Sequence, residues 1–192
     1  SLCEKYNTYC DNVVLFEPSK NLFKNLETKF QSNEKIKINN SEFSSSNKKF
    51  DCFLLMDVIE HIENPQTLIK SLYDSLNENG KILINVPAFQ HLYSKFDEDV
   101  GHFKRYTKSS FVKELLLIKP KKVKMFYYDF LGYFLSLVSQ LLFLVSKKYK
   151  KNYKKDFKSK IKLWNYLIPI SKILDRCAIN SLGKSLFIII NK

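Results

Sequence analysis

The stretch from residue 50 to residue 65 constrains the fold of this chain more than any other, and it reads FDCFLLMDVIEHIENP. Its apolar run at 52–56 is too short for a helix and too apolar for a surface loop, so it predicts a strand buried on both faces, as in a parallel sheet. Acidic and imidazole groups follow at once, and Asn64-Pro65 predicts the N-cap and first turn of a helix. Because open α/β sheets bind ligands at the carboxyl ends of their strands, this strand end is a candidate site.

Short apolar runs alternate with segments of helical periodicity along the rest of the chain. Strands are predicted at 13–17, 35–38, 81–86, 123–128 and 185–191. A helix is predicted at 19–29, with Leu22, Phe23 and Leu26 on one face. A second is predicted from Leu68 to a left-handed end at Asn79-Gly80, and a third begins after Thr107. Further helices are predicted at 130–146 and over 157–177, the latter with a break at Pro169. This order predicts an α/β fold with a doubly wound, mostly parallel sheet. Residues 88–101 are expected to form a loop over the site.

Glu17 ends the first predicted strand. In nucleotide-binding α/β folds an acid at this place binds the ribose hydroxyls, about 20 residues after a glycine-rich turn. The chain has no G-x-G, and counting back that far passes its first residue. We therefore expect a fragment that lacks the first strand and the glycine-rich loop, with exposed strand edges, poor solubility and weak or absent activity. A solvated strand end is the alternative interpretation of Glu17.

The formal net charge of +13 invites a nucleic-acid interpretation. However, nearly all the positive residues are lysines, only Arg105 and Arg176 are arginines, and no recognition motif is present, so nucleic-acid binding is disfavoured. The four cysteines include no C-x-x-C pair, which argues against a zinc site or a disulfide framework and favours a reducing, cytoplasmic location.

The segment 130–146 carries no charge and is followed at once by Lys147-Lys148-Tyr149-Lys150-Lys151. A membrane-spanning helix needs about 20 apolar residues, so this length is borderline. Three alternatives stay open: a helix in the core or in a dimer surface, an interfacial helix with its lysines on anionic headgroups, or a spanning helix. Peripheral membrane contact through 130–151, at the inner face of a membrane, is therefore one possible partnership.

Three segments resemble class I S-adenosylmethionine-dependent methyltransferases. They are DVIEHI at 57–62, LNENGKILINVP at 76–87, and a D-x-x-x-G-H-x-x-R-Y pattern at 97–106. The last resembles a subgroup whose members often modify sugars, lipid-linked intermediates or quinone precursors. The resemblance implies a single Rossmann-like methyltransferase domain over 1–192 with an antiparallel last strand, a helical insertion at 130–178, and S-adenosylmethionine as cofactor.

The resemblance also implies which residues form the site. The implied cofactor-binding residues are Glu17, Glu42, Phe43, Asp57, Val58 and His61. A base near its ordinary pKa helps when the methyl acceptor is a hydroxyl, and a histidine suits that task. We favour His102 slightly over His61, with Arg105 and Tyr106 orienting the substrate. A purely structural hydrogen bond is the alternative for each histidine.

A metal alternative rests on Asp57-x-x-Glu60-His61, which resembles the ligand set of small-RNA terminal methyltransferases. Two carboxylates and an imidazole suit Mg²⁺ or Mn²⁺. Because the sequence places no further ligand clearly, we expect no metal and keep this set as the alternative.

The leading function is thus methyl transfer from S-adenosylmethionine to a hydroxyl of a sugar, lipid-linked or quinone-like small molecule. A non-catalytic basic module that binds anionic membrane or nucleic acid is the alternative, and a nicotinamide-dependent oxidoreductase ranks far behind. For this function, Glu17, Asp57 and the His102 loop are expected to converge at one rim of one sheet. The sequence does not indicate the oligomeric state.

Overall fold

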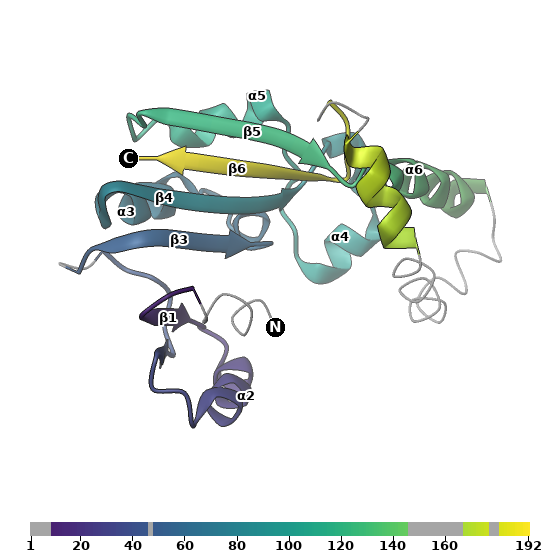
Figure 1. The fold of residues 1–192 in the computed structure, drawn as a ribbon. Coiled ribbons are helices and arrows are strands. Elements are labelled where there is room, and N and C mark those ends of the chain that lie inside the picture. The colour runs from purple at the N-terminus through teal and green to yellow at the C-terminus, as the bar shows by residue number, and fades with distance from the viewer. Residues whose placement is uncertain (1–8, 46–47, 146–166, 177–180) are drawn as a thin grey trace. The chain divides into compact units, whose positions relative to one another are not determined.

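The computed structural model describes residues 9–45, 48–145, 167–176 and 181–192 (Figure 1). The chain divides into two compact units, residues 1–45 and residues 46–192, and each is described by itself.

The first unit is a strand, a helix and a strand, as the sequence predicts. Strands β1 (Val13–Phe16) and β2 (Ile36–Asn39) pair in parallel, and helix α2 (Lys20–Phe30) connects them. The Ser19 hydroxyl caps α2 by accepting from the Leu22 N–H at 3.5 Å. On the predicted apolar face of this helix, Leu22 is exposed while Phe23 and Leu26 are half-buried, and Phe30 is the buried residue of α2.

The second unit is built on a four-stranded sheet. Its strands are β3 (Phe50–Met56), β4 (Leu76–Pro87), β5 (Lys122–Tyr128) and β6 (Ser185–Asn191), in the order β3-β4-β6-β5. β3 and β4 are parallel, and β6 is antiparallel to both β4 and β5. The predicted mixed sheet with an antiparallel last strand is therefore confirmed, and Figure 1 shows β6 running between β4 and β5 in the opposite direction.

Helices and short 3₁₀ turns connect the strands. They are η1 (Ile59–His61), α3 (Gln66–Asp74), η2 (Gln90–Leu92), α4 (Lys95–Val100), α5 (Lys108–Val112), η3 (Lys113–Leu115), α6 (Phe130–Val145) and a helix over 167–176. Thr107 caps α5 as predicted, because its hydroxyl accepts from the Ser110 N–H at 3.1 Å. The predicted loop over 88–101 contains η2 and α4, so part of it is helical.

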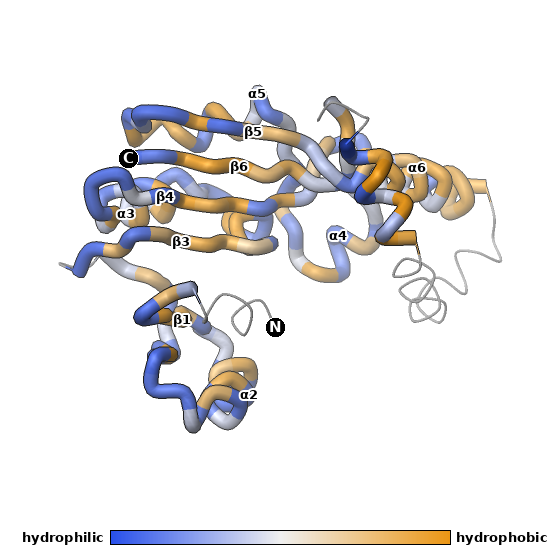
Figure 2. Tube along the Cα trace, in the orientation of Figure 1, coloured by the Kyte–Doolittle hydropathy of each residue, from blue (hydrophilic) through white to orange (hydrophobic). Residues whose placement is uncertain are grey.

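The core of the second unit lies on one face of its sheet. Alternate residues of β4 and β6 are fully buried there: Ile82, Ile84, Val86, Leu186, Ile188 and Ile190. Figure 2 shows apolar stretches along both strands. The prediction that the strand at 52–56 is buried on both faces is wrong. Phe53 and Leu55 point to the core, but Cys52 is exposed and Leu54 is 44% exposed, because they lie on the opposite face, which the described residues cover only in part.

The predicted end of the third helix is also wrong. α3 begins one residue later than expected, with Pro65 at the N-cap position, and it ends at Asp74 rather than at Asn79-Gly80. The chain then enters β4, where Leu76 pairs with Phe50. Asn79 does adopt the left-handed conformation, with φ of 64°. It lies within an irregularity of β4, because Phe50 pairs with Leu76 while Cys52 pairs with Lys81.

Residues 167–176 form one helix that includes Pro169. The predicted break at Pro169 is wrong for these described residues, because the helix continues through it. The rest of the predicted helical segment at 157–177 and the lysines at 147–162 lie outside the described residues.

α6 confirms the predicted helix at 130–146 and attaches to the segment that follows β4. The Tyr133 hydroxyl and His91 Nε2 are 3.0 Å apart, and the Gln140 side chain donates to the Tyr93 carbonyl at 3.0 Å. The rest of the helix exposes apolar side chains: Phe134, Leu135, Val138, Leu141, Leu142, Leu144 and Val145. Among the described helices, none combines the length and the apolar character needed to cross a bilayer.

Two substitutions test the one-sided core. Ile84→Ala removes a fully buried side chain and should lower the free energy of unfolding by about 2–5 kcal/mol. Leu54→Ala, on the opposite face of the neighbouring strand, should cost less than about 1.5 kcal/mol because its side chain is already half exposed. Urea unfolding of both variants gives the comparison, and equal losses would mean that both faces are covered.

Candidate functional site

The carboxyl edge of strands β3, β4 and β5 is marked by unusual backbone. Asp57, Phe89 and Asp129, which lie just beyond the ends of these strands, have φ of 54°, 61° and 66°. Such angles are uncommon outside glycine, and each costs on the order of 1–3 kcal/mol. Strain of this kind concentrates at functional sites, so this edge is the first place to look for one.

A chain of polar side chains crosses the sheet at this edge. The Tyr128 hydroxyl on β5 donates to Asn85 Oδ1 on β4 at 2.7 Å, and the Asn85 amide donates to Asp57 Oδ1 after β3 at 2.8 Å. Burial raises the pKa of Tyr128, which keeps the phenol protonated and able to donate. The network fixes the direction of the Asp57 carboxylate.

Asp97 in α4 is the centre of a second, buried network. Its Oδ1 accepts from Arg105 Nε at 2.9 Å and from His102 Nδ1 at 2.8 Å. Its Oδ2 accepts from Arg105 Nη2 at 3.0 Å and from the Ser94 backbone N–H at 2.8 Å. The contact with Ser94 is half of a capping box, so the start of α4 itself positions the carboxylate.

The network determines the tautomer of a neutral His102. Burial opposes ionisation of Asp97, but hydrogen bonds and charge from Arg105 outweigh it, and with the hydrogen bond from His102 they hold the pKa of Asp97 below its usual value. The carboxylate is therefore ionised, and His102 donates through Nδ1. The lone pair of a neutral His102 is then on Nε2.

Glu60, on η1, faces His102. Its Oε1 lies 3.9 Å from His102 Nε2, its side chain is 0% exposed, and neither carboxylate oxygen has a hydrogen-bond partner among the described residues. Burial raises the pKa of Glu60 to about 7, against the lowering effect of its own backbone N–H.

His61 completes a compact group with these two residues. Its ring meets the His102 ring edge to face at 4.7 Å between centroids, and its Nδ1 lies 3.2 Å from the Gly101 carbonyl oxygen. One ligand atom each from Glu60, His61 and His102 lies within 4.8 Å of the other two. Asp57, part of the metal set considered from the sequence, is outside this group, although it is near enough for the charges of both histidines to act on its carboxylate.

Arg105 and Tyr106 follow His102 in the same loop, and both side chains are buried. Arg105 is 7% exposed, and besides Asp97 its guanidinium donates to the Ala88 carbonyl at 3.3 Å. Tyr106 is buried, its backbone N–H donates to the Pro87 carbonyl at 2.9 Å, and burial raises the pKa of its hydroxyl. These contacts position the loop against the end of β4; direct orientation of a substrate by either residue stays a prediction.

The predicted cofactor-binding residues fall in both units. In residues 1–45, the Glu17 carboxylate accepts from the Ser19 N–H at 2.9 Å, and the Phe43 ring meets the Phe16 ring at 5.1 Å. Glu42 is exposed in the same unit. Val58, in the second unit, is exposed beside Asp57. Convergence of Glu17 with Asp57 and His102 stays a prediction.

Sequence reasoning missed three residues of the site: Asn85, Asp97 and Tyr128. Asp97 could have been found, because it is the first residue of the D-x-x-x-G-H-x-x-R-Y pattern, and its two partners are the histidine and the arginine of that pattern. Nothing in the sequence separates Asn85 or Tyr128 from other polar residues at strand ends.

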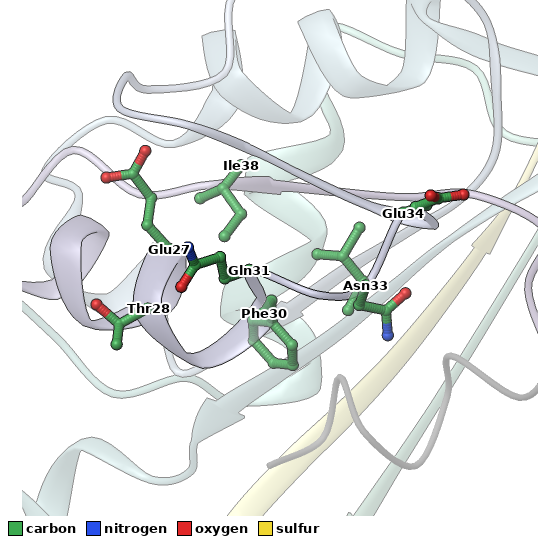
Figure 3. A pocket seen from close by; sticks show the side chains of 8 residues that line it. Glu27, Thr28, Phe30, Gln31, Asn33, Glu34 and Ile38 are labelled. Carbon is green, nitrogen blue, oxygen red and sulfur yellow. The ribbon is translucent and has the colours of Figure 1, made fainter.

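The first unit also contains a surface hollow, whose lining shares no residue with the site described so far (Figure 3). It lies between the end of α2 and β2, and its lining is Glu27, Thr28, Phe30, Gln31, Asn33, Glu34, Ile36 and Ile38. It contains none of the residues that the sequence or the strand-end geometry singles out. We therefore assign it no role.

A sequence model of the methyltransferase domain matches residues 1–116. The chain belongs to this methyltransferase domain family. The match includes both units up to η3, and with it the Asp97 network and the group of Glu60, His61 and His102. A search of curated proteins found no match.

Solved structures agree with the family assignment. The methyltransferase chain resembles phosphoethanolamine N-methyltransferase 2 from Haemonchus contortus in complex with S-adenosyl-L-methionine, with a TM-score of 0.59, 13% identity, and coverage of 99% of this chain and 45% of that one. It also resembles coclaurine N-methyltransferase bound to N-methylheliamine and SAH, with a TM-score of 0.58, 13% identity, and coverage of 100% and 63%. A third similar structure is that of the plantazolicin methyltransferase BpumL, with a TM-score of 0.57, 16% identity, and coverage of 100% of this chain and 72% of that one.

At this low identity, the structural similarity shows the fold alone, which is Rossmann-like. The chain spans less than two thirds of the length of the Haemonchus and coclaurine enzymes.

Removing the charge of Asp97 tests the buried network. Asp97→Asn leaves the Arg105 guanidinium buried without its counter-ion and should lower the free energy of unfolding by about 3–5 kcal/mol. Glu98→Gln is the matched control, because it breaks an exposed pair with Lys95 and should cost less than about 1 kcal/mol. Denaturant unfolding at pH 7 measures both, and a loss for Asp97→Asn no greater than the control would contradict the network.

The same variant predicts a pH dependence. Because the pKa of Asp97 is depressed in the folded protein, its contribution to stability is present above the unfolded pKa of about 3.9 and is lost as the pH falls through the folded pKa. The stability difference between the native protein and Asp97→Asn should therefore shrink in acid. A difference that stays constant from pH 7 to the acid limit of folding would contradict an ionised Asp97.

Proposed function

We propose that this chain is the catalytic part of an S-adenosylmethionine-dependent methyltransferase that methylates a hydroxyl of a sugar, lipid-linked or quinone-like small molecule. The family match and the fold support methyl transfer. The choice of an oxygen acceptor rests on one observation: His102 Nδ1 donates to an ionised, buried Asp97, which directs the Nε2 lone pair of His102 away from that carboxylate.

Methyl transfer from a sulfonium is an in-line displacement, so the enzyme has to align donor and acceptor and exclude water. A hydroxyl acceptor must also lose its proton, whereas a neutral amine attacks with a lone pair that it already has. An imidazole held in one tautomer by a carboxylate can accept that proton at Nε2. Arg105 and Tyr106 position this loop against β4, and His61 lies beside His102 at the same rim.

The cofactor is proposed to lie along the carboxyl edge of the sheet. Asp57 and Val58 would contact its amino-acid part together with His61, since all three follow β3 directly. In the first unit, Glu17 at the end of β1 would bind the ribose hydroxyls, and Glu42 and Phe43 the adenine. An acid at the end of such a strand is the usual ribose ligand in nucleotide-binding α/β folds.

Peripheral contact with the inner face of a membrane is part of the proposal. Leu141, Leu144 and Val145 on α6 are 60%, 72% and 70% exposed, and lysines follow in the sequence from residue 147. An apolar helix face next to a cluster of lysines suits binding at an anionic lipid surface. Such contact would bring the site to a lipid-linked acceptor.

Titration of SAH into the full-length protein tests the proposed function, followed by a methyl-transfer assay with hydroxyl acceptors. We expect saturable SAH binding. His102→Ala should lower kcat by about 10²–10⁴-fold, because it removes the base, while the Kd for SAH changes little. His91→Ala, at the third histidine, is the control and should keep the native kcat. Absence of SAH binding would refute methyl transfer, and a His102→Ala variant with native kcat would refute the base.

Vesicle flotation tests the membrane contact. The protein should float with phosphatidylglycerol-containing vesicles at low salt and not with pure phosphatidylcholine, because the lysines require anionic headgroups. Leu141→Glu with Leu144→Glu should abolish flotation without changing the Kd for SAH. Equal flotation of native and doubly substituted protein would contradict a role for α6.

A further inference from the structure

The carboxylate of Glu60 has no role in the chemistry described so far. It is fully buried, and among the described residues neither of its oxygens accepts a hydrogen bond. Burying a carboxylate without partners is costly, so a polar group that would compensate it is expected at this place. The groups that face it are the two imidazoles of His61 and His102.

In both imidazoles, Nδ1 contacts an oxygen of the protein, which leaves Nε2 for coordination. His102 Nδ1 donates to Asp97 Oδ1 at 2.8 Å, and His61 Nδ1 lies 3.2 Å from the Gly101 carbonyl oxygen, which can only accept. In each ring the proton is therefore on Nδ1 and the lone pair is on Nε2. A carboxylate or a backbone carbonyl on the far nitrogen is the usual support of a metal-binding histidine, since it fixes the tautomer and raises the basicity of the ligand.

The three side chains come from two segments that are tied together by their backbone. Glu60 and His61 belong to η1, and His102 follows α4. The Phe103 N–H donates to the Glu60 carbonyl at 2.8 Å, which holds the two segments side by side. His102 Nε2 and Glu60 Oε1, at 3.9 Å, are within an adjustment of less than about 1 Å of the spacing of two ligands on one ion.

We propose that Glu60, His61 and His102 bind one divalent transition-metal ion through one carboxylate oxygen and two imidazole nitrogens. Two nitrogen ligands and a single carboxylate suit Zn²⁺ and its neighbours, whereas Mg²⁺ and Ca²⁺ require mainly oxygen ligands. Three protein ligands leave at least one coordination position open, which is the pattern of catalytic rather than structural zinc. His61 is exposed, so the open position faces solvent on its side of the group.

This site deepens the proposed methyl transfer and rests on it for its role in the reaction. His102 is the base in the metal-free protein; with the ion bound, its Nε2 lone pair would be a ligand and the ion would make the acceptor hydroxyl acidic in its place. The hydroxyl proton leaves to water, the oxygen forms a bond to the methyl carbon, and the bond from that carbon to sulfur breaks. The products are the methyl ether, SAH and one proton.

Metal binding can be measured without any methyl acceptor. The chelator-treated full-length protein is titrated with Zn²⁺ by calorimetry, and with Co²⁺ by its visible absorption, which reports nitrogen and oxygen ligation directly. The native protein should bind one equivalent. Glu60→Gln keeps the shape of the side chain but lacks the anionic ligand, and it should weaken binding by about tenfold or more. His61→Ala should do the same.

His91→Ala is the matched control, because His91 is outside the group and should leave the affinity within about twofold. The cysteines are unchanged in all variants, so thiol binding cancels in the comparison. Equal affinity of the native protein and Glu60→Gln, or no binding by the native protein, would overturn the proposal. SAH titration is run on the same samples: intact SAH binding without metal binding removes only the metal site, whereas loss of SAH binding in the native protein removes the proposed function.

Discussion

The buried ion pair between Asp97 and Arg105 is the interaction on which the rest of the site depends. A carboxylate and a guanidinium that are both almost completely removed from water are stable only when they satisfy each other, and here two parallel hydrogen bonds do so. The pair fixes the charge of Asp97, and that charge fixes the tautomer of His102. The guanidinium also reaches the Ala88 carbonyl, so the same pair ties the loop above the site to the end of β4.

The sheet supplies the opposite side of the site. β3, β4 and β5 end at one edge, and each is followed closely by a residue with positive φ. At this edge the hydrogen bonds from Tyr128 to Asn85 and from Asn85 to Asp57 hold the polar side chains in place. The one-sided core supports this edge, because the fully buried residues of β4 and β6 leave the strands little freedom to move.

Much of the fold follows from the sequence because its signals are local. Apolar runs bounded by Asn, Asp, Gly or Pro predict the strands. Thr107 predicts the start of α5, because its hydroxyl accepts from the N–H of Ser110, three residues further along the chain. The predictions fail where contacts between residues far apart in the sequence determine the structure. Leu54 belongs to an apolar run but lies on the less covered face, and Leu76 continues a helical spacing but pairs with Phe50 in the sheet. In the site, His61, His102 and Arg105 were named from the sequence, but the contacts of His102 and Arg105 with Asp97 form only in the folded loop.

A structure of the full-length protein with SAH bound tests the central claim most directly. The account predicts that the sulfur of SAH lies at the carboxyl edge of β3 and β4, that Nε2 of His102 faces it across the space for the acceptor, and that Nδ1 stays on Asp97. SAH bound away from this edge, or a His102 ring turned so that Nε2 meets Asp97, would contradict it.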